Sequence, residues 1–161
     1  MTNATPFRIA INGYGRIGQC VLRALYENGY RDHLQVVAIN ELSDIDTIAH
    51  LTKYDSTHGR FHGEVAVDGD NLVVNGDRIR VLRHPEPEEL PWRLLDVDLV
   101  LECSGAYSDR ATAEKHIEAG ARRLLFSQPG DPDVDRTVVF GINEGDLNGQ
   151  DVIVAAGSCT T

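Results

Sequence analysis

The chain has 161 residues, of which 42% are hydrophobic, and its 15 Lys plus Arg stand against 25 Asp plus Glu, giving a formal net charge of −10. A chain of this length forms one domain that buries roughly 70% of its unfolded surface without a metal or disulfide to hold it, and the negative charge disfavours nucleic acid or an anionic membrane as a partner. Three separated cysteines, no basic leader and no long apolar run further indicate a cytoplasmic protein without a disulfide framework, a metal site or a membrane span.

The N-terminal part of the chain predicts a βαβ unit. The range Phe7–Asn12 has the apolar run of a buried strand and is followed by a glycine-rich turn. Apolar residues then recur at helical spacing until Gly29 supplies a stop, and Leu34–Asn40 returns as a second buried strand.

Residues 64–82 predict an antiparallel excursion from this sheet, because Asp68-Gly69-Asp70 and Asn75-Gly76 are hairpin turn signals. After it, a helix capped by Ser108 is expected to end near Gly120. Short apolar runs predict further strands at Leu99–Glu102 and at residues 124–127, 137–140 and 152–155. The predicted fold class is therefore α/β, a Rossmann-type doubly wound parallel sheet with an inserted antiparallel hairpin region.

The glycine turn after the first strand has the pattern GxGxxG, with glycines at Gly13, Gly15 and Gly18. In this pattern the first glycine permits a tight turn, the second lets a pyrophosphate approach the backbone, and the third lets the helix pack closely on the strand. Free N–H groups at the helix start and the helix dipole both favour phosphate there. A bare GxGxxG match also arises by chance, but a strand before it and a helix after it favour a cofactor site.

An acidic residue completes the dinucleotide fingerprint. Glu41 comes directly after the second predicted strand, where it can accept hydrogen bonds from the adenosine ribose. A carboxylate repels a 2′-phosphate, and no Arg or Lys follows before Lys53, so the sequence predicts NAD as the cofactor in preference to NADP.

Cys159 follows a predicted strand, where this architecture places the start of a helix. That position favours a thiolate, which can attack an aldehyde carbonyl while backbone N–H groups stabilise the oxyanion. The alternative for any single cysteine is a small buried hydrophobe, and we expect that role for Cys20 and Cys103. No histidine has a spacing that commits it to Cys159, so we expect all six to be solvated or structural, namely His33, His50, His58, His62, His84 and His116.

Several segments occur together in a recognisable order: INGYGRIG, VAIN, KYDSTHGRF, EAGARRLLFS and SCTT. Over essentially its whole length the chain resembles the N-terminal, cofactor-binding half of the glyceraldehyde-3-phosphate dehydrogenase family. The segments NELSD, LPW and LLFSQPG and the loop over residues 26–33 look more like the erythrose-4-phosphate dehydrogenase branch of that family. An Asp usually stands at the place of Glu41 in the glycolytic branch.

The resemblance implies a role for particular residues. Backbone groups of Arg16 and Ile17 would contact the pyrophosphate, and Glu41 would hold the adenosine ribose. Arg83 is a possible substitute for an arginine that usually lies near the adenine. The remaining implied positions are Ser104 and Gly105 lining the cofactor cleft, Ser127 near the nicotinamide, Cys159 as the catalytic thiol, and Ser158 and Thr160 beside the site for the substrate phosphate or the attacking water.

The resemblance also implies an NAD-dependent oxidation of a small phosphorylated aldehyde through a cysteine thioester. Water would release 4-phosphoerythronate in the erythrose branch, a step toward pyridoxal phosphate, whereas phosphate would release an acyl phosphate in the glycolytic branch. We expect residues 1–161 to be an NAD-binding domain whose catalytic domain is absent, inactive alone and taken from a homotetrameric parent. The alternative is a non-catalytic dinucleotide-sensing module in which Cys159 is a structural or redox-sensitive thiol.

Overall fold

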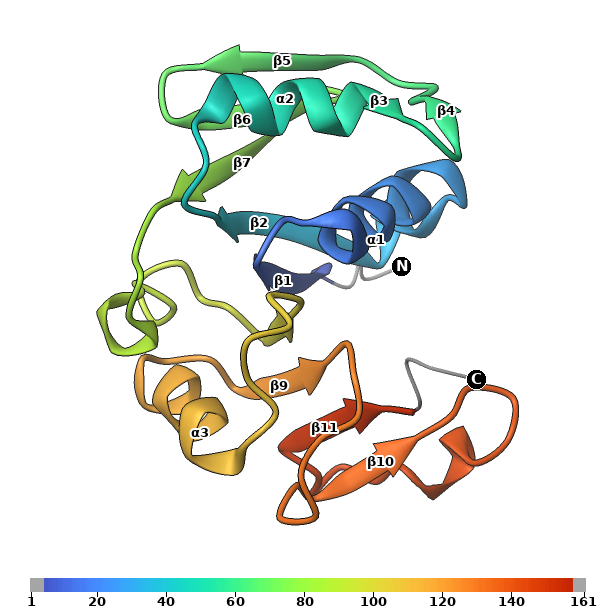
Figure 1. The fold of residues 1–161 in the computed structure, drawn as a ribbon, viewed down its shortest axis with the longest axis vertical. Helices are drawn as coiled ribbons and strands as arrows, with labels where there is room; N and C mark the ends of the chain where they lie inside the picture. Colours follow the sequence, from blue (N-terminus) through green and yellow to red (C-terminus); the bar gives the residue numbers. More distant parts are fainter. Residues whose placement is uncertain (1–4, 158–161) are drawn as a thin grey trace.

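A computed structural model describes residues 5–157, and its main feature is one nine-stranded sheet with the strand order β10-β11-β9-β8-β1-β2-β7-β6-β5 (Figure 1). The strands of this sheet are β1 (Phe7–Asn12), β2 (Leu34–Asn40), β5 (Val65–Asp68), β6 (Asn71–Val74), β7 (Asp77–Leu82), β8 (Leu99–Glu102), β9 (Arg123–Phe126), β10 (Arg136–Val138) and β11 (Ile153–Ala156). From β10 to β7 all neighbours are parallel, whereas β5, β6 and β7 pair antiparallel. The doubly wound α/β fold and its antiparallel insertion are therefore confirmed, and β7 joins that insertion to the parallel sheet.

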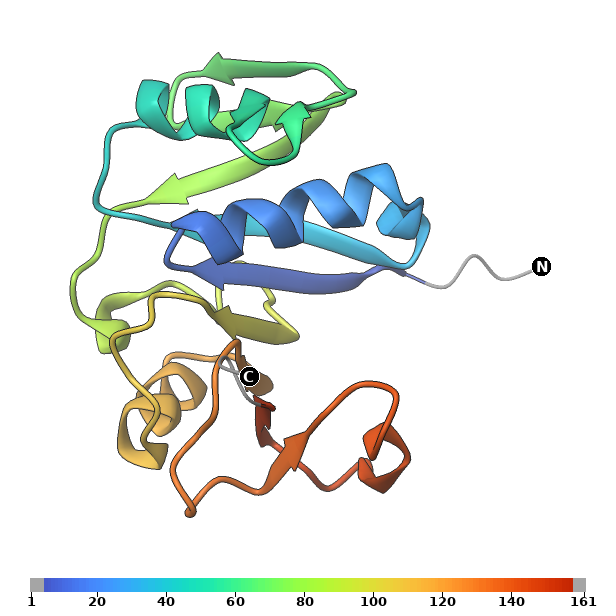
Figure 2. The same ribbon diagram turned by 45° about the vertical axis from the view of Figure 1, so that its right-hand side comes forward.

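In the part of the chain that the structure describes, three α-helices lie against this sheet: α1 (Arg16–Glu27), α2 (Ile45–Lys53) and α3 (Arg110–Glu118). Figures 1 and 2 show α1 and α2 beside the β1, β2 and β5–β7 strands, while α3 lies beside β9 at the other end of the sheet. Short 3-10 turns occur at η1 (Tyr30–Asp32), η2 (Pro87–Glu89) and η3 (Glu144–Asp146). A separate hairpin of β3 (Tyr54–Asp55) and β4 (Gly59–Arg60) follows α2 and was not predicted.

The two faces of the central strands carry different hydrophobic cores. Ile11 of β1 packs with Leu22 of α1 and Ile48 of α2, whereas its neighbour Ala10 faces the core that holds Trp92 and Ala113 of α3. Successive side chains of a strand point to opposite faces, so a strand buried on both faces reads as a continuous apolar run. This burial explains why the sequence located β1, β2 and β8 at their observed bounds.

The helix before β9 begins one residue later than the sequence predicted. Asp109, not Ser108, is the N-cap of α3, because its carboxylate accepts hydrogen bonds from the N–H and hydroxyl of Thr112. Ser108 Oγ instead donates to Asp131. Both residue types cap helices well, so the tertiary contact of Ser108 decided between them. The predicted stop at Gly120 agrees with the end of α3 at Glu118.

Candidate functional site: a cleft at the carboxyl ends of the strands

A cleft of about 210 Å³ lies where β1, β2 and β8 end. Three of the predicted residues line it, Gly13, Glu41 and Ser104, together with His84, Pro85 and Tyr107. The strand order reverses here, because β1 is followed by β2 on one side and lies beside β8 on the other. Open α/β sheets bind their ligands at such a reversal, outside the carboxyl ends of the strands.

The three glycines of the turn are required for different reasons. Gly13 has φ +91° and lies so close to the next loop that a Cβ on it would come 2.5 Å from the Ser104 backbone N. A Cβ on Gly18 would lie 2.5 Å from the Gly13 carbonyl oxygen and 3.2 Å from Ile11 Cγ2. At Gly15, by contrast, a Cβ would have no neighbour within 4 Å, and the backbone is ordinary and extended, with φ −77° and ψ −156°. Packing therefore requires Gly13 and Gly18, while Gly15 leaves open space.

The open space at Gly15 lies at the N-terminus of α1. Gly15 is the N-cap and provides no side-chain hydrogen bond, and the first turn contains no acidic residue. The first N–H groups of a helix lack partners within the helix, and the helix dipole favours negative charge beside them. Backbone N–H groups and space for a phosphate thus coincide, so the residues present fit the pyrophosphate of a dinucleotide.

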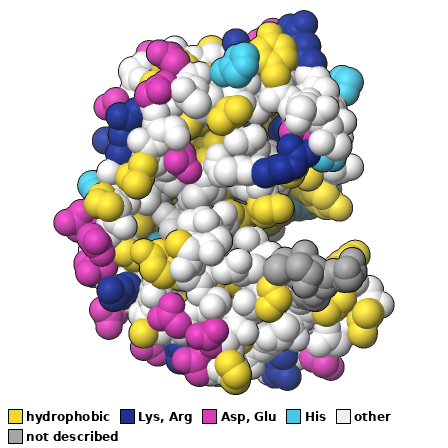
Figure 3. Space-filling model, viewed as in Figure 1, with side chains coloured by type: hydrophobic (Ala, Val, Ile, Leu, Met, Phe, Trp, Pro, Cys, Tyr) yellow, Lys and Arg dark blue, Asp and Glu magenta, His cyan; other side chains and the backbone are white. Residues whose placement is uncertain are grey.

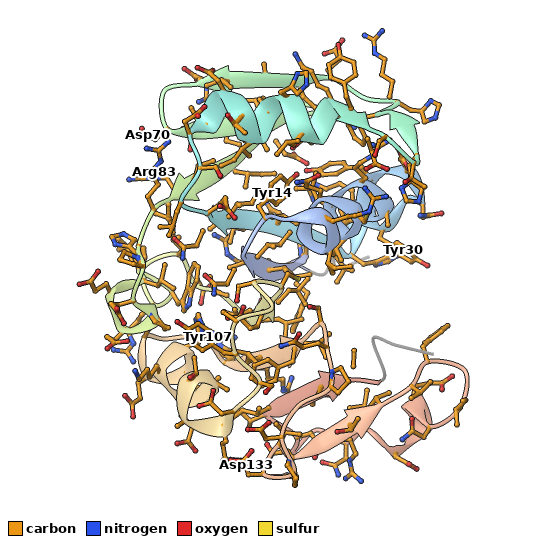
Figure 4. All side chains as sticks on the ribbon, viewed as in Figure 1. Tyr14, Tyr30, Asp70, Arg83, Tyr107 and Asp133 are labelled. Atoms are coloured by element: carbon orange, nitrogen blue, oxygen red, sulfur yellow. The ribbon has the colours of Figure 1, made fainter. Side chains whose placement is uncertain are left out.

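Glu41 connects the end of β2 to this glycine turn. Its Oε1 accepts a hydrogen bond of 2.9 Å from the Tyr14 N–H, and its Oε2 accepts from the N–H and hydroxyl of Ser43, both at 3.2 Å. The side chain of Tyr14 leaves the turn on the other side, where its hydroxyl lies 2.7 Å from Thr52 Oγ1 in the space between α1 and α2 (Figure 4). These bonds hold the Glu41 carboxylate at a fixed position relative to the glycine turn, which recognition of a ribose requires.

The side chain of Arg16 points away from the cleft. Its Nη1 lies 2.8 Å from Asp55 Oδ1, in the β3–β4 hairpin. Hydrogen bonds from the backbone N–H and imidazole of His58, together with the Arg16 guanidinium, lower the pKa of Asp55 to about 2 although its partial desolvation opposes them. This ion pair occupies the Arg16 side chain, so only the backbone of Arg16 remains for the pyrophosphate contact that the resemblance implies. Ile17, in the same turn, is exposed.

Arg83 follows β7, directly before the residues His84 and Pro85 that line the cleft. It does not line the cleft, and Figure 4 shows it beside Asp70 at the outer end of β7. The reason is that the backbone of His84 is held by Asn40, whose amide donates to the His84 carbonyl and accepts from the His84 N–H, each at 2.9 Å. These two bonds turn His84 and Pro85 toward the cleft.

The η2 segment, which follows Pro85, has an acidic surface. On the face seen in Figure 3, acidic side chains gather over it, where Glu86, Glu88 and Glu89 are exposed.

Three predicted residues follow the ends of the neighbouring strands β8 and β9. Ser104 and Gly105 follow β8, and Gly105 has φ +73°. Ser127 follows β9 and donates its N–H to the Glu102 carbonyl at 3.0 Å. Cys103 lies between these strand ends, and burial raises the pKa of its thiol to about 11. A raised pKa disfavours the reactive thiolate at neutral pH, which is what a structural role of Cys103 requires.

Cys159, Ser158 and Thr160 lie outside the described residues, so their roles stay predictions. Of the six histidines, His116 is fully buried against Trp92, His58 pairs with Asp55, His84 lines the cleft, and His33, His50 and His62 are exposed. Within residues 5–157 no cluster of potential metal ligands occurs, and no helix there is long and apolar enough to cross a bilayer.

A row of polar residues beneath the cleft was not predicted from the sequence. Asn12, Asn40 and Glu102 are the last residues of β1, β2 and β8, and all three side chains are buried. A signal for them existed, because each ends an otherwise apolar run. Buried polar groups need partners, and these three residues provide them for one another.

The parallel sheet, the glycine turn at the start of α1 and the carboxylate at the end of β2 define the class of protein as a dinucleotide-binding domain of the Rossmann type. Comparison with known proteins then gives the family. The family described as glyceraldehyde 3-phosphate dehydrogenase, NAD binding domain, matches residues 7–110. The chain belongs to this family, and NAD is its cofactor.

Two relatives from Cupriavidus necator are close in sequence. The chain is 54% identical over 154 residues to the plasmid glyceraldehyde-3-phosphate dehydrogenase of that organism and 53% identical over 154 residues to the chromosomal one. Each alignment covers 96% of this chain but 46% of the relative. The chain therefore spans about half the length of these curated relatives.

Proposed function

We propose that this chain supplies the NAD-binding half of a dehydrogenase that oxidises the aldehyde of a small phosphorylated sugar. The observation that carries the proposal is the single cleft in which the Gly13 turn, the Glu41 carboxylate and Ser104 meet. The dehydrogenases named above, which share more than half of their aligned residues with this chain, support the reaction type.

In this proposal the residues of the chain hold NAD at three places. The N–H groups at the start of α1 bind the pyrophosphate, with the backbone of Arg16 and Ile17 closest to the turn. Glu41 accepts hydrogen bonds from the adenosine ribose, for which its carboxylate is already oriented by the Tyr14 N–H. Ser104, Gly105 and Ser127 border the remaining part of the cofactor. When bound, NAD supplies the acceptor for a hydride.

Cys159 is proposed as the nucleophile. Its thiolate adds to the aldehyde carbon, and after oxidation the product remains bound to the sulfur as a thioester. Water or inorganic phosphate then attacks the thioester carbonyl and releases the thiolate, with Ser158 and Thr160 bordering that site. A general base is also needed, and we propose that it lies in a catalytic domain that follows these residues in the parent protein.

Two substrates are proposed for the parent, glyceraldehyde 3-phosphate on the names of the two relatives and erythrose 4-phosphate on Glu41 and the NELSD, LPW and LLFSQPG segments. Steady-state kinetics of the complete parent with each sugar, with and without phosphate, separate them. Phosphate-dependent turnover of glyceraldehyde 3-phosphate supports the first substrate. Phosphate-independent turnover of erythrose 4-phosphate supports the second.

The cofactor role can be tested on the 161-residue chain by calorimetric titration with NAD⁺. Gly15→Val places a side chain in the open space at the turn, where nothing lies within 4 Å of the Cβ position. We expect affinity to fall at least tenfold, equivalent to about 1.4 kcal/mol, with the unfolding free energy changed by less than about 0.5 kcal/mol. Gly145→Ala, also in open space but remote in η3, is the matched control. Equal affinity in wild type and Gly15→Val contradicts the placement of the pyrophosphate.

A non-catalytic sensing module is the competing function. Alkylation of the complete parent by iodoacetamide distinguishes the two, because a catalytic thiolate reacts much faster than a buried thiol. We expect Cys159 to react first and Cys103 last. Equal slow reaction of Cys20, Cys103 and Cys159 would favour the sensing module.

A further inference from the structure

The buried polar residues under the cleft form one continuous hydrogen-bonded row. Asn40 Nδ2 donates to Asn12 Oδ1 at 2.8 Å, and Asn12 Nδ2 donates to Glu102 Oε2 at 2.7 Å. The side chains therefore link the ends of three adjacent parallel strands, β2, β1 and β8. With exposed fractions of 7%, 8% and 1%, Asn40, Asn12 and Glu102 are shielded from water, so each depends on these bonds.

The donors and acceptors of the row can run in one direction only. The His84 N–H, a backbone group that can only donate, donates to Asn40 Oδ1. The Asn40 amide nitrogen must therefore face Asn12, where it meets the carbonyl oxygen and leaves the Asn12 amide nitrogen facing Glu102. The row that begins at β2 therefore ends with the Asn12 amide nitrogen donating to the Glu102 carboxylate.

A second set of donors reaches Glu102 from the opposite side. The Trp92 indole N–H, also a donor only, donates to His116 Nδ1 at 3.0 Å, so the proton of the neutral imidazole is on Nε2. His116 Nε2 lies 3.3 Å from Glu102 Oε2, although it is not aligned for a regular hydrogen bond. The N–H and hydroxyl of Ser104 both donate to Glu102 Oε1, the N–H at 2.9 Å.

An ionised carboxylate has acceptors for all of these groups, whereas an amide would place a hydrogen against one of them. Burial by itself raises the pKa of Glu102, but the side chains of His116, Ser104 and Asn12 and the Ser104 N–H outweigh it and hold the pKa below its usual range. Glu102 is thus a buried charge stabilised by directed hydrogen bonds and not by a cationic side chain.

The two oxygens of Glu102 hold the two segments that meet in the cleft. Oε2 binds Asn12, the residue before Gly13, and Oε1 binds Ser104, whose backbone N would lie 2.5 Å from a Cβ on Gly13. We propose that Glu102 is a positioning residue that fixes the Gly13 turn against Ser104 and so shapes the cleft before NAD binds. The inference rests on the cofactor role of the cleft, and a preformed site binds more tightly because less ordering accompanies binding.

The test compares Glu102→Gln with the wild-type 161-residue chain. Glutamine keeps the size of the side chain but presents an NH₂ group to one of the donors. We expect the dissociation constant for NAD⁺, measured by calorimetry at equal folded fraction, to rise at least tenfold. Ile79→Val, a buried position of β7 outside the cleft, is the control for general destabilisation. The proposal is overturned if Ile79→Val weakens NAD⁺ binding as much as Glu102→Gln does, or if Glu102→Gln binds NAD⁺ as tightly as the wild type.

A second substitution tests the direction of the row. In Asn12→Asp/Glu102→Gln the carboxylate is moved to position 12, where it can accept from Asn40 and from the new glutamine amide, while the glutamine carbonyl accepts from Ser104. The His116 Nε2–H then faces the glutamine amide, and the new carboxylate lines the cleft, so amide exchange and not affinity is measured. A positioning role predicts that exchange at Ser104 in the double variant returns toward the wild-type rate. Exchange as fast as in Glu102→Gln overturns the proposed mechanism.

Amide hydrogen exchange in the NAD-free chain keeps this proposal separate from the cofactor role. Glu102→Gln should accelerate exchange at Ser104 and at Tyr14, both beside the Gly13 contact, but not at Val36 in the middle of β2. If Glu102→Gln accelerates exchange at these amides but the wild-type chain binds no NAD⁺, the cofactor role is contradicted and the positioning role is still supported. Unchanged exchange at Ser104 and Tyr14 would overturn the positioning role.

Discussion

The centre of the sheet and its β10–β11 edge are stabilised in different ways. Central strands are buried on both faces, as Ile11, Ala38 and Val100 show with no exposed surface at all. The edge strands are three and four residues long, and the segment between them leaves apolar side chains in solvent, namely Val139, Phe140, Ile142 and Leu147. Apolar burial on both faces therefore holds the central strands, whereas at the β10–β11 edge Ile153 and Ala155 of β11 are buried and directed polar bonds supply the remaining contacts.

A matched pair of phenylalanines gives the largest expected contrast between these regions. Phe126 of β9 is fully buried, whereas Phe140 is 90% exposed. We expect Phe126→Ala to lower the unfolding free energy by about 3–5 kcal/mol and Phe140→Ala to change it by less than about 0.5 kcal/mol. Urea denaturation of both variants measures the difference. A large loss in Phe140→Ala would mean that the edge also depends on apolar packing.

Gly13→Ala tests whether the turn belongs to the tightly packed centre. The new Cβ meets the Ser104 backbone at 2.5 Å, and the positive φ of +91° is itself unfavourable for alanine. We expect a loss of about 3 kcal/mol in unfolding free energy together with loss of NAD⁺ binding. Gly149→Ala, with no neighbour within 4 Å, is the control for glycine replacement and should behave like wild type. Wild-type stability of Gly13→Ala would show that the Ser104 loop moves freely.

Asp135 should have a smaller, pH-dependent effect confined to the edge. Hydrogen bonds from Arg110 and from the backbone N–H groups of Ile153 and Val152 lower its pKa to about 2, against a usual value of 3.8. Because the folded-state pKa is depressed, this stabilisation is present above about pH 4 and is lost as the pH falls toward 2. We expect Asp135→Asn to lower the free energy of opening β11 by about 1–2 kcal/mol, measured by hydrogen exchange of the Ile153 amide.

The control for this effect is Asp133→Asn, since Asp133 is exposed at the same edge (Figure 4). Its substitution should leave exchange at Ile153 unchanged. Equal effects of the two variants would assign the result to net charge and not to the Asp135 hydrogen bonds.

The sequence-based predictions are most accurate for the longest buried strands. The bounds of β1, β2 and β8 agree with their apolar runs, whereas the ranges predicted for β9, β10 and β11, residues 124–127, 137–140 and 152–155, were one or two residues off. Long runs buried on both faces leave little choice of register. Short strands at an edge take their ends from polar contacts such as those of Asp135, which the sequence does not reveal.

The candidate site shows a similar limit. GxGxxG and a following acid located Gly13 and Glu41 because the pattern carries the steric and charge requirements of the turn. The role suggested for Arg83 stays a prediction, whereas the lining position of His84, which the sequence did not reveal, depends on the bonds between Asn40 and the His84 backbone. The capping role assigned to Ser108 was wrong for the same kind of reason, a long-range bond to Asp131.

The sequence by itself determined the class of fold, the glycine turn, the acid at the end of β2 and the NAD-binding family, because local steric needs and apolar periodicity are written in consecutive residues. Tertiary structure alone decided that the last residues of β1, β2 and β8 form one directed row of hydrogen bonds with a buried charge at Glu102. Those three residues are 28 and 62 positions apart in the chain, which is the difference between 12, 40 and 102, and only strand pairing brings their donors and acceptors together.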